Sequence, residues 1–185
     1  MSEQPRRPKT KATSLTSIAE FRIQKARQCY EVALDLFGLD LSELPKSVAQ
    51  LSQLRALSLG RNRLKTLPKS IGQLSQLQTL MLDNNQLAAL PESIGQLSQL
   101  QSLSLSNNQL TTLPKSIGQL SQLRTLYLDD NQLTRLPELL RRLTRLEKLY
   151  LHGNEALGLP AEVLGPKWHE SSAESAKPAA ILDYY

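Results

Sequence analysis

The chain repeats one pattern of apolar and polar positions six times. Each unit reads L-x-x-L-x-x-L-x-L-x-x-N-x-L-x-x-L-P-x-x-I-G-x, and the units occupy about residues 28–165. The period is a strict 23 residues, as the prolines show at Pro45, Pro68, Pro91, Pro114, Pro137 and Pro160. Because strand side chains alternate between two faces, each L-x-L segment predicts a short strand with both leucines buried. The repetition predicts that these strands stack in parallel.

The other columns of the unit predict how the chain continues after each strand. An asparagine column comes after the strands, where each amide can bond backbone groups of its own and the next turn. We expect a buried ladder of Asn62, Asn85, Asn108, Asn131 and Asn154. Proline then stops the strand, and K-S-I-G-Q-L-S-Q-L predicts a short helical or 3-10 turn on the outer side. This is the leucine-rich repeat signature. The predicted fold is an α/β solenoid, a horseshoe of about six 23-residue repeats with parallel strands on its concave face.

Both ends depart from the unit, as the caps of a solenoid do. Leu39 stands in the first unit where later units have asparagine, and apolar residues before it recur at roughly helical spacing. We predict a disordered basic tail at 1–13, an N-terminal cap helix at 14–30 and the repeat solenoid at 31–165. Residues 166–185 are interpreted as a C-terminal cap and linker stub.

The net charge of +5 does not belong to the repeats. Residues 1–27 carry seven basic and two acidic side chains, whereas residues 28–185 carry fifteen of each. A neutral body without an extended basic stripe argues against nucleic-acid binding. No apolar run reaches the ~18 residues of a membrane span, and no apolar stretch follows the basic start. With a single cysteine, Cys29, no intramolecular disulfide is expected. We therefore expect a cytoplasmic protein that binds no membrane.

Catalytic and cofactor chemistry has little support in the sequence. One cysteine and two histidines give no metal-ligand spacing. No G-x-x-x-x-G-K-[ST] loop is present, so no nucleotide site of that kind is expected. His152 and Asp129 occupy neighbouring strands, yet no motif places a nucleophile with them. We expect no catalytic, cofactor or metal site in this chain.

The outward residues of the strands carry the variable chemistry. The outer segments are nearly identical in three units, whereas the outward strand residues differ from unit to unit. Solenoids bind partners through this extended concave surface, so we expect a protein partner there. The candidate contact residues are Tyr127, Tyr150, His152, Asp129, Asp130, Met81, Asp83, Arg61 and Arg63.

Tyr127 and Tyr150 lie one unit apart, which predicts that they stack as neighbours beside His152 and the acidic pair. Exposed aromatic side chains among polar neighbours are typical of interface hot spots. We predict that this pair anchors a protein segment; the alternative is that the tyrosines only pack on each other. Arg61 and Arg63, with Arg55, form a second candidate group, for which a solvated edge is the alternative. Met81 and Asp83 lie between the two groups.

The segments on either side of the repeats resemble those of one family. The entry A-E-F-R-I-Q-K-A-R … V-A-L-D-L-F-G-L-D-L-S-E-L-P (residues 19–45) is similar to the helix and first repeat of bacterial Roco proteins. The exit L-H-G-N-E-A-L-G-L-P-A-E-V-L-G (residues 151–165), followed by K-P-A-A-I-L-D-Y-Y, is similar to the end of their repeat region. In that family a Roc GTPase domain and a COR dimerisation domain come next.

The resemblance implies a regulatory or recognition module of a Roco GTPase that docks on its own Roc–COR domains or on effectors. It also implies that the chain is a fragment ending before the P-loop, and that GTP is a ligand of the parent protein. Two other functions stay open: the substrate-recognition domain of a ligase-type bacterial effector, and a structural spacer. The 23-residue period argues against the effector, whose units are typically shorter, and the varied strand residues argue against the spacer. Weak homodimerisation through the tyrosine-bearing face also stays open.

Overall fold

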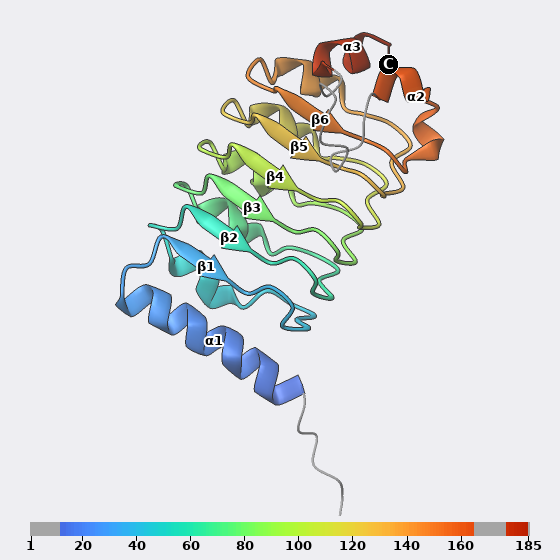
Figure 1. Cartoon of the computed structure of the whole chain (residues 1–185). Helices are drawn as coiled ribbons and strands as arrows, with labels where there is room; N and C mark the ends of the chain where they lie inside the picture. The colour runs from blue at the N-terminus through green and yellow to red at the C-terminus, as the bar shows by residue number, and fades with distance from the viewer. Residues whose placement is uncertain (1–11, 165–176, 185) are drawn as a thin grey trace, which may run out of the picture.

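One parallel sheet of six short strands runs through the molecule (Figure 1). The computed structural model describes residues 12–164 and 177–184. The strands follow one another in sequence order, and each residue pairs with the residue one repeat further on, as Leu34 does with Leu57. They are β1 (Ala33–Asp35), β2 (Ala56–Ser58), β3 (Thr79–Met81), β4 (Ser102–Ser104), β5 (Thr125–Tyr127) and β6 (Lys148–Tyr150). The register is therefore the 23-residue period of the sequence.

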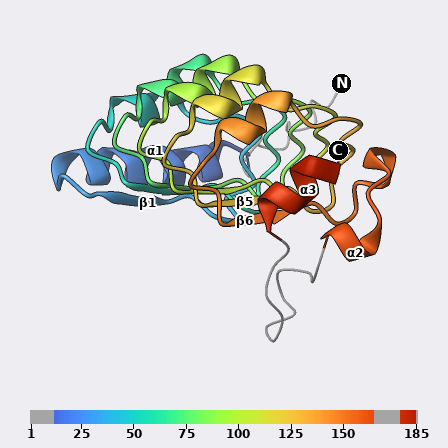
Figure 2. The same cartoon turned by 90° about the horizontal axis from the view of Figure 1, so that it is seen from above.

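A row of 3-10 turns forms the second layer, opposite the strands (Figure 2). A proline precedes each of the first five turns, because its fixed φ ends the extended segment. The turns of this row are η1 (Lys46–Gln50), η2 (Lys69–Gln73), η3 (Glu92–Gln96), η4 (Lys115–Gln119) and η5 (Glu138–Arg142). A further 3-10 turn, η6 (Glu155–Leu157), directly follows Asn154 and is out of the 23-residue register of the row. The predicted outer turns are confirmed.

Leucine columns fill the space between the two layers. The inward leucines of the strands, such as Leu80 and Leu103, are fully buried, and so are the turn residues Ile94 and Ile117 that face them. Each unit alone would leave this apolar face in water, so burial depends on stacking against the next unit. The open sheet and its continuous core confirm the horseshoe solenoid.

The asparagine column forms hydrogen bonds between consecutive repeats. Asn108 Nδ2 donates to the carbonyl oxygens of Leu82 (2.9 Å) and Leu105 (2.9 Å), and its Oδ1 accepts from the N–H of Leu87 at 3.0 Å. Asn62, Asn85, Asn131 and Asn154 are buried in the same position. Each amide thus satisfies buried backbone groups that the strand ends leave unpaired.

The residue before each ladder asparagine has a left-handed backbone. These residues are Arg61, Asn84, Asn107, Asp130 and Gly153, with φ between 51° and 71°. Glycine, asparagine and aspartate tolerate this conformation best. Its recurrence turns the chain out of the sheet at the same point in every repeat.

Helix α1 (Ala12–Gln28) covers the N-terminal end of the core. It buries Ala19, Ile23 and Ala26, which lie on one face at helical spacing. Arg22 Nη1 donates to the Asp35 carbonyl oxygen of the edge strand β1 at 2.7 Å.

The predicted bounds of this end need correction. The helix begins at residue 12 rather than 14, so the first two of its residues were wrongly assigned to the tail, whose residues 1–11 lie outside the described part. It ends at Gln28 rather than at 30, because the chain turns there and Tyr30 has a φ of 52°. Leu39 takes the asparagine position of the first unit and is buried.

The C-terminal end carries helix α2 (Ala161–Leu164) and helix α3 (Pro178–Tyr184). Ile181 and Leu182 of α3 join the core cluster. Arg141 of η5 forms an ion pair with Asp183 at 2.7 Å and donates to the Leu182 carbonyl oxygen. Helix α3 lies within the range 166–185 that the sequence assigns to a C-terminal cap and linker stub, and residues 166–176 and 185 of that range fall outside the described part. Within that part, no helix has the length and apolar character needed to cross a membrane.

Candidate functional site

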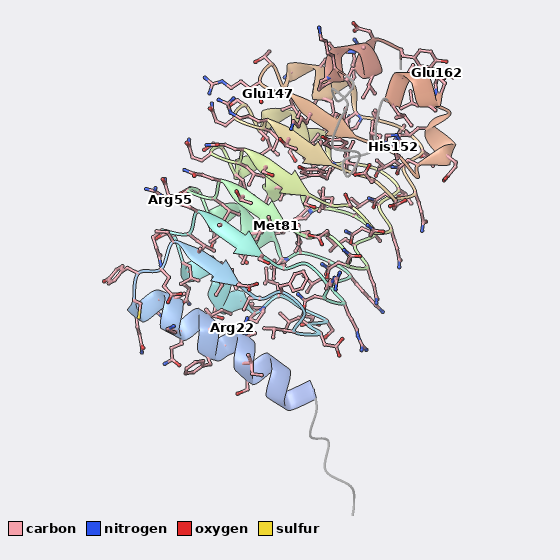
Figure 3. The ribbon with its side chains drawn as sticks, in the orientation of Figure 1. Arg22, Arg55, Met81, Glu147, His152 and Glu162 are labelled. Atoms are coloured by element: carbon pink, nitrogen blue, oxygen red, sulfur yellow. The ribbon has the colours of Figure 1, made fainter. Side chains whose placement is uncertain are left out.

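The outward side chains of the six strands form a continuous surface, which we call the strand face. Figure 3 places Met81 near its middle, with Arg55 and Glu147 along one edge and His152 toward the other. One line of residues crosses all six strands in consecutive register, and we call it the central row. It consists of Asp35, Ser58, Met81, Ser104, Tyr127 and Tyr150.

Tyr127 and Tyr150 end the central row as a stacked pair. Their ring centroids are 5.0 Å apart and their planes differ by 6°. Tyr127 is half-buried, whereas Tyr150 is only 7% exposed. The predicted stacking is confirmed, but the expectation that both rings are exposed is wrong for Tyr150. Parallel stacking covers one face of each ring. Because Tyr150 is also buried by other neighbours, Tyr127 offers more surface than Tyr150 for contact with a partner.

Asp129 and His152 lie beside the tyrosine pair. Asp129 is 3% exposed, Ser106 Oγ donates to its Oδ2 at 3.2 Å, and its Oδ1 lies 3.7 Å from His152 Nδ1. Burial raises the pKa of the Asp129 carboxyl, against the opposing effects of the Ser106 hydroxyl and of His152. Burial, with the nearby Tyr150 and Asp129, also raises the pKa of Tyr127. The Tyr127 hydroxyl is therefore a neutral hydrogen-bond donor at physiological pH.

Asp130 is the exposed member of the acidic pair. Its side chain leans over Gly153, where a Cβ would lie 2.3 Å from the Asp130 Oδ1 atom. Glycine at position 153 therefore makes room for this carboxylate. The structure brings Asp129, Asp130 and His152 to the end of the face where the tyrosines stack.

Met81 and Asp83 occupy the middle of the strand face, as the sequence predicts. Met81 is 46% exposed, the most exposed apolar side chain in the central row. Asp83 accepts a hydrogen bond from Asn84 Nδ2 at 3.0 Å. Both of its carboxylate oxygens lie 3.0 Å from the point that a Cβ on Gly60 would occupy, so this carboxylate leans toward the second repeat.

Arg61 and Arg63 have separate partners. The Arg61 guanidinium lies 5.6 Å from the ring centroid of Phe37, which is a cation–π contact. Arg63 forms an ion pair with Asp40. The sequence interpretation missed Phe37, which is 44% exposed on the strand face. The sequence contained a signal for this position. Phe37, Gly60 and Asp83 follow one another at the 23-residue period, so they belong to one outward column.

The strand face carries several kinds of polar and aromatic group. No cluster of three or more His, Cys, Asp or Glu able to hold a metal is found among residues 12–164 and 177–184. Hydroxyl, carboxylate and aromatic groups instead follow one another across the strands.

Comparison with known proteins identifies the repeat. One family model, described as leucine rich repeat, matches residues 33–87, and another, described as leucine-rich repeat region, matches residues 77–158. The solenoid is a leucine-rich repeat domain. No curated protein matches the chain. Leucine-rich repeat domains generally mediate protein–protein interaction, and their fold is typically non-catalytic.

Solved structures contain similar leucine-rich repeat domains. An LRR protein of Leptospira interrogans is 40% identical with a TM-score of 0.61, over 82% of this chain and 36% of that one. The leucine-rich repeat domain of the type III effector XopL is 27% identical with a TM-score of 0.62, over 81% of this chain and 62% of that one. The chain therefore spans about a third of the first protein and less than two thirds of the second.

A plant leucine-rich repeat domain shows the fold with a bound partner. The ectodomain of the Arabidopsis thaliana receptor kinase GASSHO1/SCHENGEN3 was solved in complex with CASPARIAN STRIP INTEGRITY FACTOR 2. It is 31% identical with a TM-score of 0.56, over 60% of this chain and 14% of that one.

Proposed function

We propose that this leucine-rich repeat domain is a non-catalytic protein-binding and regulatory module whose strand face docks a protein partner. The observation that carries this proposal is the stacked Tyr127–Tyr150 pair on the same row as the exposed Met81. Stacked aromatic side chains that are already partly desolvated lose little entropy on binding, and tyrosine is enriched in hot spots. The pair is the anchor of the docking surface.

The parent protein in this proposal is a bacterial, cytoplasmic Roco GTPase. Support comes from the similarity of residues 19–45 and 151–165 to the entry and exit of Roco repeat regions. The partner is then the protein's own Roc–COR region, and GTP belongs to that region rather than to this chain. The coding sequence after codon 185 tests the parentage: a G-x-x-x-x-G-K-[ST] motif supports it, and a different domain or a stop codon contradicts it.

A second candidate is the substrate-recognition domain of a bacterial effector. It is favoured by the likeness to the leucine-rich repeat domain of the type III effector XopL. The same coding sequence separates the two, because an effector would continue into a different catalytic domain. In both cases the strand face is the docking surface.

Affinity measurements between this chain and a separately produced Roc–COR region test the docking surface. The double variant Tyr127→Ala, Tyr150→Ala is expected to raise the dissociation constant for the partner at least about tenfold, as hot-spot truncations do. Tyr30→Ala is the matched control, because Tyr30 is exposed in the turn after α1 and away from the central row. Unchanged affinity in a double variant that circular dichroism shows to be folded would overturn the proposal.

A further inference from the structure

Large and small side chains alternate along the central row. Ser58 lies between Asp35 and Met81, and Ser104 lies between Met81 and Tyr127. Both serines are half-buried, whereas Met81 between them is 46% exposed. The outward residues that precede them are also small, Ala56 before Ser58 and Ser102 before Ser104. After Ser58, the Asp83 carboxylate and the Phe37 ring lie 3.0–3.1 Å from the Cβ position of Gly60, and after Ser104 the buried Ser106 bonds Asp129. The strand face thus has two low positions, separated by Met81.

The distance between the two low positions follows from the sheet. They lie two strands apart, and neighbouring strands are ~4.8 Å apart, so the separation is about 9.6 Å. A polyproline II helix has three residues per turn and rises ~3.1 Å per residue, so every third side chain points the same way at about 9.3 Å intervals. An extended strand repeats at about 6.7 Å, and helical positions seven apart lie ~10.5 Å apart. The polyproline II repeat fits best.

The chemistry beside the low positions suits the same conformation. A polyproline II backbone has no internal hydrogen bonds, so its carbonyl groups need external donors. The half-buried hydroxyls of Thr79, Ser102 and Thr125 form an adjacent column in register across three strands. Tyr127 adds a neutral hydroxyl and an aromatic face, and aromatic-lined surfaces are how other domains hold proline-rich segments.

The charge of strands β3 to β5 favours one sign of occupant. The outward residues of these strands and of the turns that follow them include three carboxylates, Asp83, Asp129 and Asp130, and no lysine or arginine. Arg61 lies in the second repeat, outside this range, with its guanidinium over the Phe37 ring. Asp130 is exposed and Asp83 half-buried, so both are accessible beside the central row. Cationic side chains of a bound segment would be paired there, and acidic ones would be repelled.

We propose that the strand face binds a proline-rich, cationic segment of a partner protein in polyproline II conformation, lying across the strands. Every third residue of the segment packs at Ser58 and at Ser104, on either side of Met81. Lysine or arginine side chains reach Asp83 and Asp130, and a proline ring packs on Tyr127. This inference rests on the proposed function and names the chemistry of its partner.

Synthetic peptides test the conformation and the charge. The probe is a twelve-residue peptide, four repeats of Pro-Arg-Ala, added to the full chain while amide chemical shifts and the dissociation constant are measured. We expect saturable shifts at Ser58, Ser104 and Tyr127. Two control peptides are expected to bind at least about tenfold more weakly: four repeats of Pro-Glu-Ala, and a peptide with the residues of the Pro-Arg-Ala probe reordered so that no two prolines are three residues apart. Equal binding of the three peptides, or no binding, overturns the inference.

Variants test the position. Ser104→Leu fills one low position and is expected to weaken binding of the Pro-Arg-Ala peptide at least about tenfold. Ser121→Leu makes the same change at an exposed outer position and is expected to leave binding unchanged. Asp83→Ser and Asp130→Asn install the residues that the fourth repeat carries at the same positions, Ser106 and Asn107. Together they should weaken binding several-fold and remove its salt dependence.

The failure of this inference can be told from that of the proposed function. Suppose that the double tyrosine variant loses partner binding but the wild-type chain does not bind the Pro-Arg-Ala peptide. The docking surface is then supported, and the polyproline II segment is overturned. Tighter binding of an amphipathic cationic helical peptide would replace that segment with a helix. The chain itself contains the sequence Pro5-Arg6-Arg7-Pro8, with prolines three apart. If the double variant Pro5→Ser, Pro8→Ser bound the Pro-Arg-Ala peptide more tightly than wild type, this segment would compete with the peptide. The occupant would then be this segment and not a partner protein.

Discussion

Tyr150 in β6 stacks on Tyr127 in β5, with ring centroids 5.0 Å apart, at positions paired in the sheet register. Aromatic pairs of this kind contribute about 0.5–1.5 kcal/mol beyond their buried area. We therefore expect the effects of Tyr127→Leu and Tyr150→Leu on the free energy of unfolding to be non-additive by about that amount. Urea denaturation of the two single variants and the double variant measures this coupling.

A second pair on the same row controls for this coupling. Met81 and Tyr127 are separated by the strand that carries Ser104. The cycle of Met81→Leu with Tyr127→Leu should be additive within about 0.5 kcal/mol. Additivity in the tyrosine cycle as well would mean that the stacking contributes nothing to folding.

The ladder asparagines are expected to be the polar residues whose loss costs most stability. Asn108→Ala leaves the N–H of Leu87 without its side-chain acceptor, and it removes one of the two asparagine donors from each of the carbonyls of Leu82 and Leu105. A buried group left unpaired costs about 1–3 kcal/mol, so we expect a loss of about that size in the free energy of unfolding. The neighbouring Gln109→Ala, at an exposed side chain, should change it by less than about 0.5 kcal/mol. Equal effects of the two substitutions in urea denaturation would contradict the role of the ladder.

The contacts that the sequence predicted are those that the repeat makes periodic. The Tyr127–Tyr150 stack joins equivalent positions of neighbouring units, and the Asn108 ladder bonds join an asparagine column to leucine columns in the same way in every unit. The contacts that it missed break that symmetry. The Arg61–Phe37 pair joins different columns, and the Arg141–Asp183 ion pair joins a turn to a terminal helix. The burial of Tyr150 was missed for a related reason: the pattern shows which face a residue is on, and its exposure depends on the side chains around it.

The stability of the domain is expected to depend on the protonation of Asp129. Burial raises the pKa of this carboxyl in the folded state, so the folded chain holds the proton more strongly than the unfolded chain. The free energy of unfolding therefore falls as the pH rises from the ordinary aspartate pKa through the raised one. Asp129→Asn removes this carboxyl, so this variant should gain stability relative to wild type at about pH 7 but not at about pH 3.

Denaturant melts at the two pH values measure this effect. Asp130→Asn is the control for the loss of one negative charge, because Asp130 is the exposed neighbour. The same stability difference at both pH values for Asp129→Asn would show that burial of this carboxyl does not oppose folding.

Glu92 is expected to show the opposite pH dependence. The hydroxyl and the backbone N–H of Ser116 in the next repeat hold the pKa of the Glu92 carboxyl below its ordinary value, and the N–H donates to Oε2 at 3.1 Å. A lowered folded-state pKa contributes stability above the ordinary glutamate pKa and loses it as the pH falls through the lowered one. Glu92→Gln should therefore destabilise the domain at neutral pH and have less effect near pH 2–3. Glu138→Gln, at the equivalent position of the last turn, is the control; an equal pH profile for both variants would rule out the Ser116 contact as the cause.

The glycine of the outer turn is expected to determine how closely the repeats stack. A Cβ at Gly95 would lie 2.6 Å from the carbonyl oxygen and 2.7 Å from the Cβ of Ser116, so Gly95→Ala forces neighbouring turns apart. We expect a loss of about 1–3 kcal/mol in the free energy of unfolding, as for other overpacked sites. The equivalent position is Ala49 in the first unit, and the reverse change, Ala49→Gly, should cost no more than about 1 kcal/mol.

The last outer turn faces a helix in place of a further repeat turn. There the equivalent residue is Arg141, whose side chain extends instead to Asp183 and to the Leu182 carbonyl oxygen of α3. The terminal helix α3 packs there in place of a further repeat turn, so a long side chain fits and ties that helix to the solenoid. If Gly95→Ala cost less than about 0.5 kcal/mol in urea denaturation, the turns could move apart freely, and close approach would not explain the glycine column.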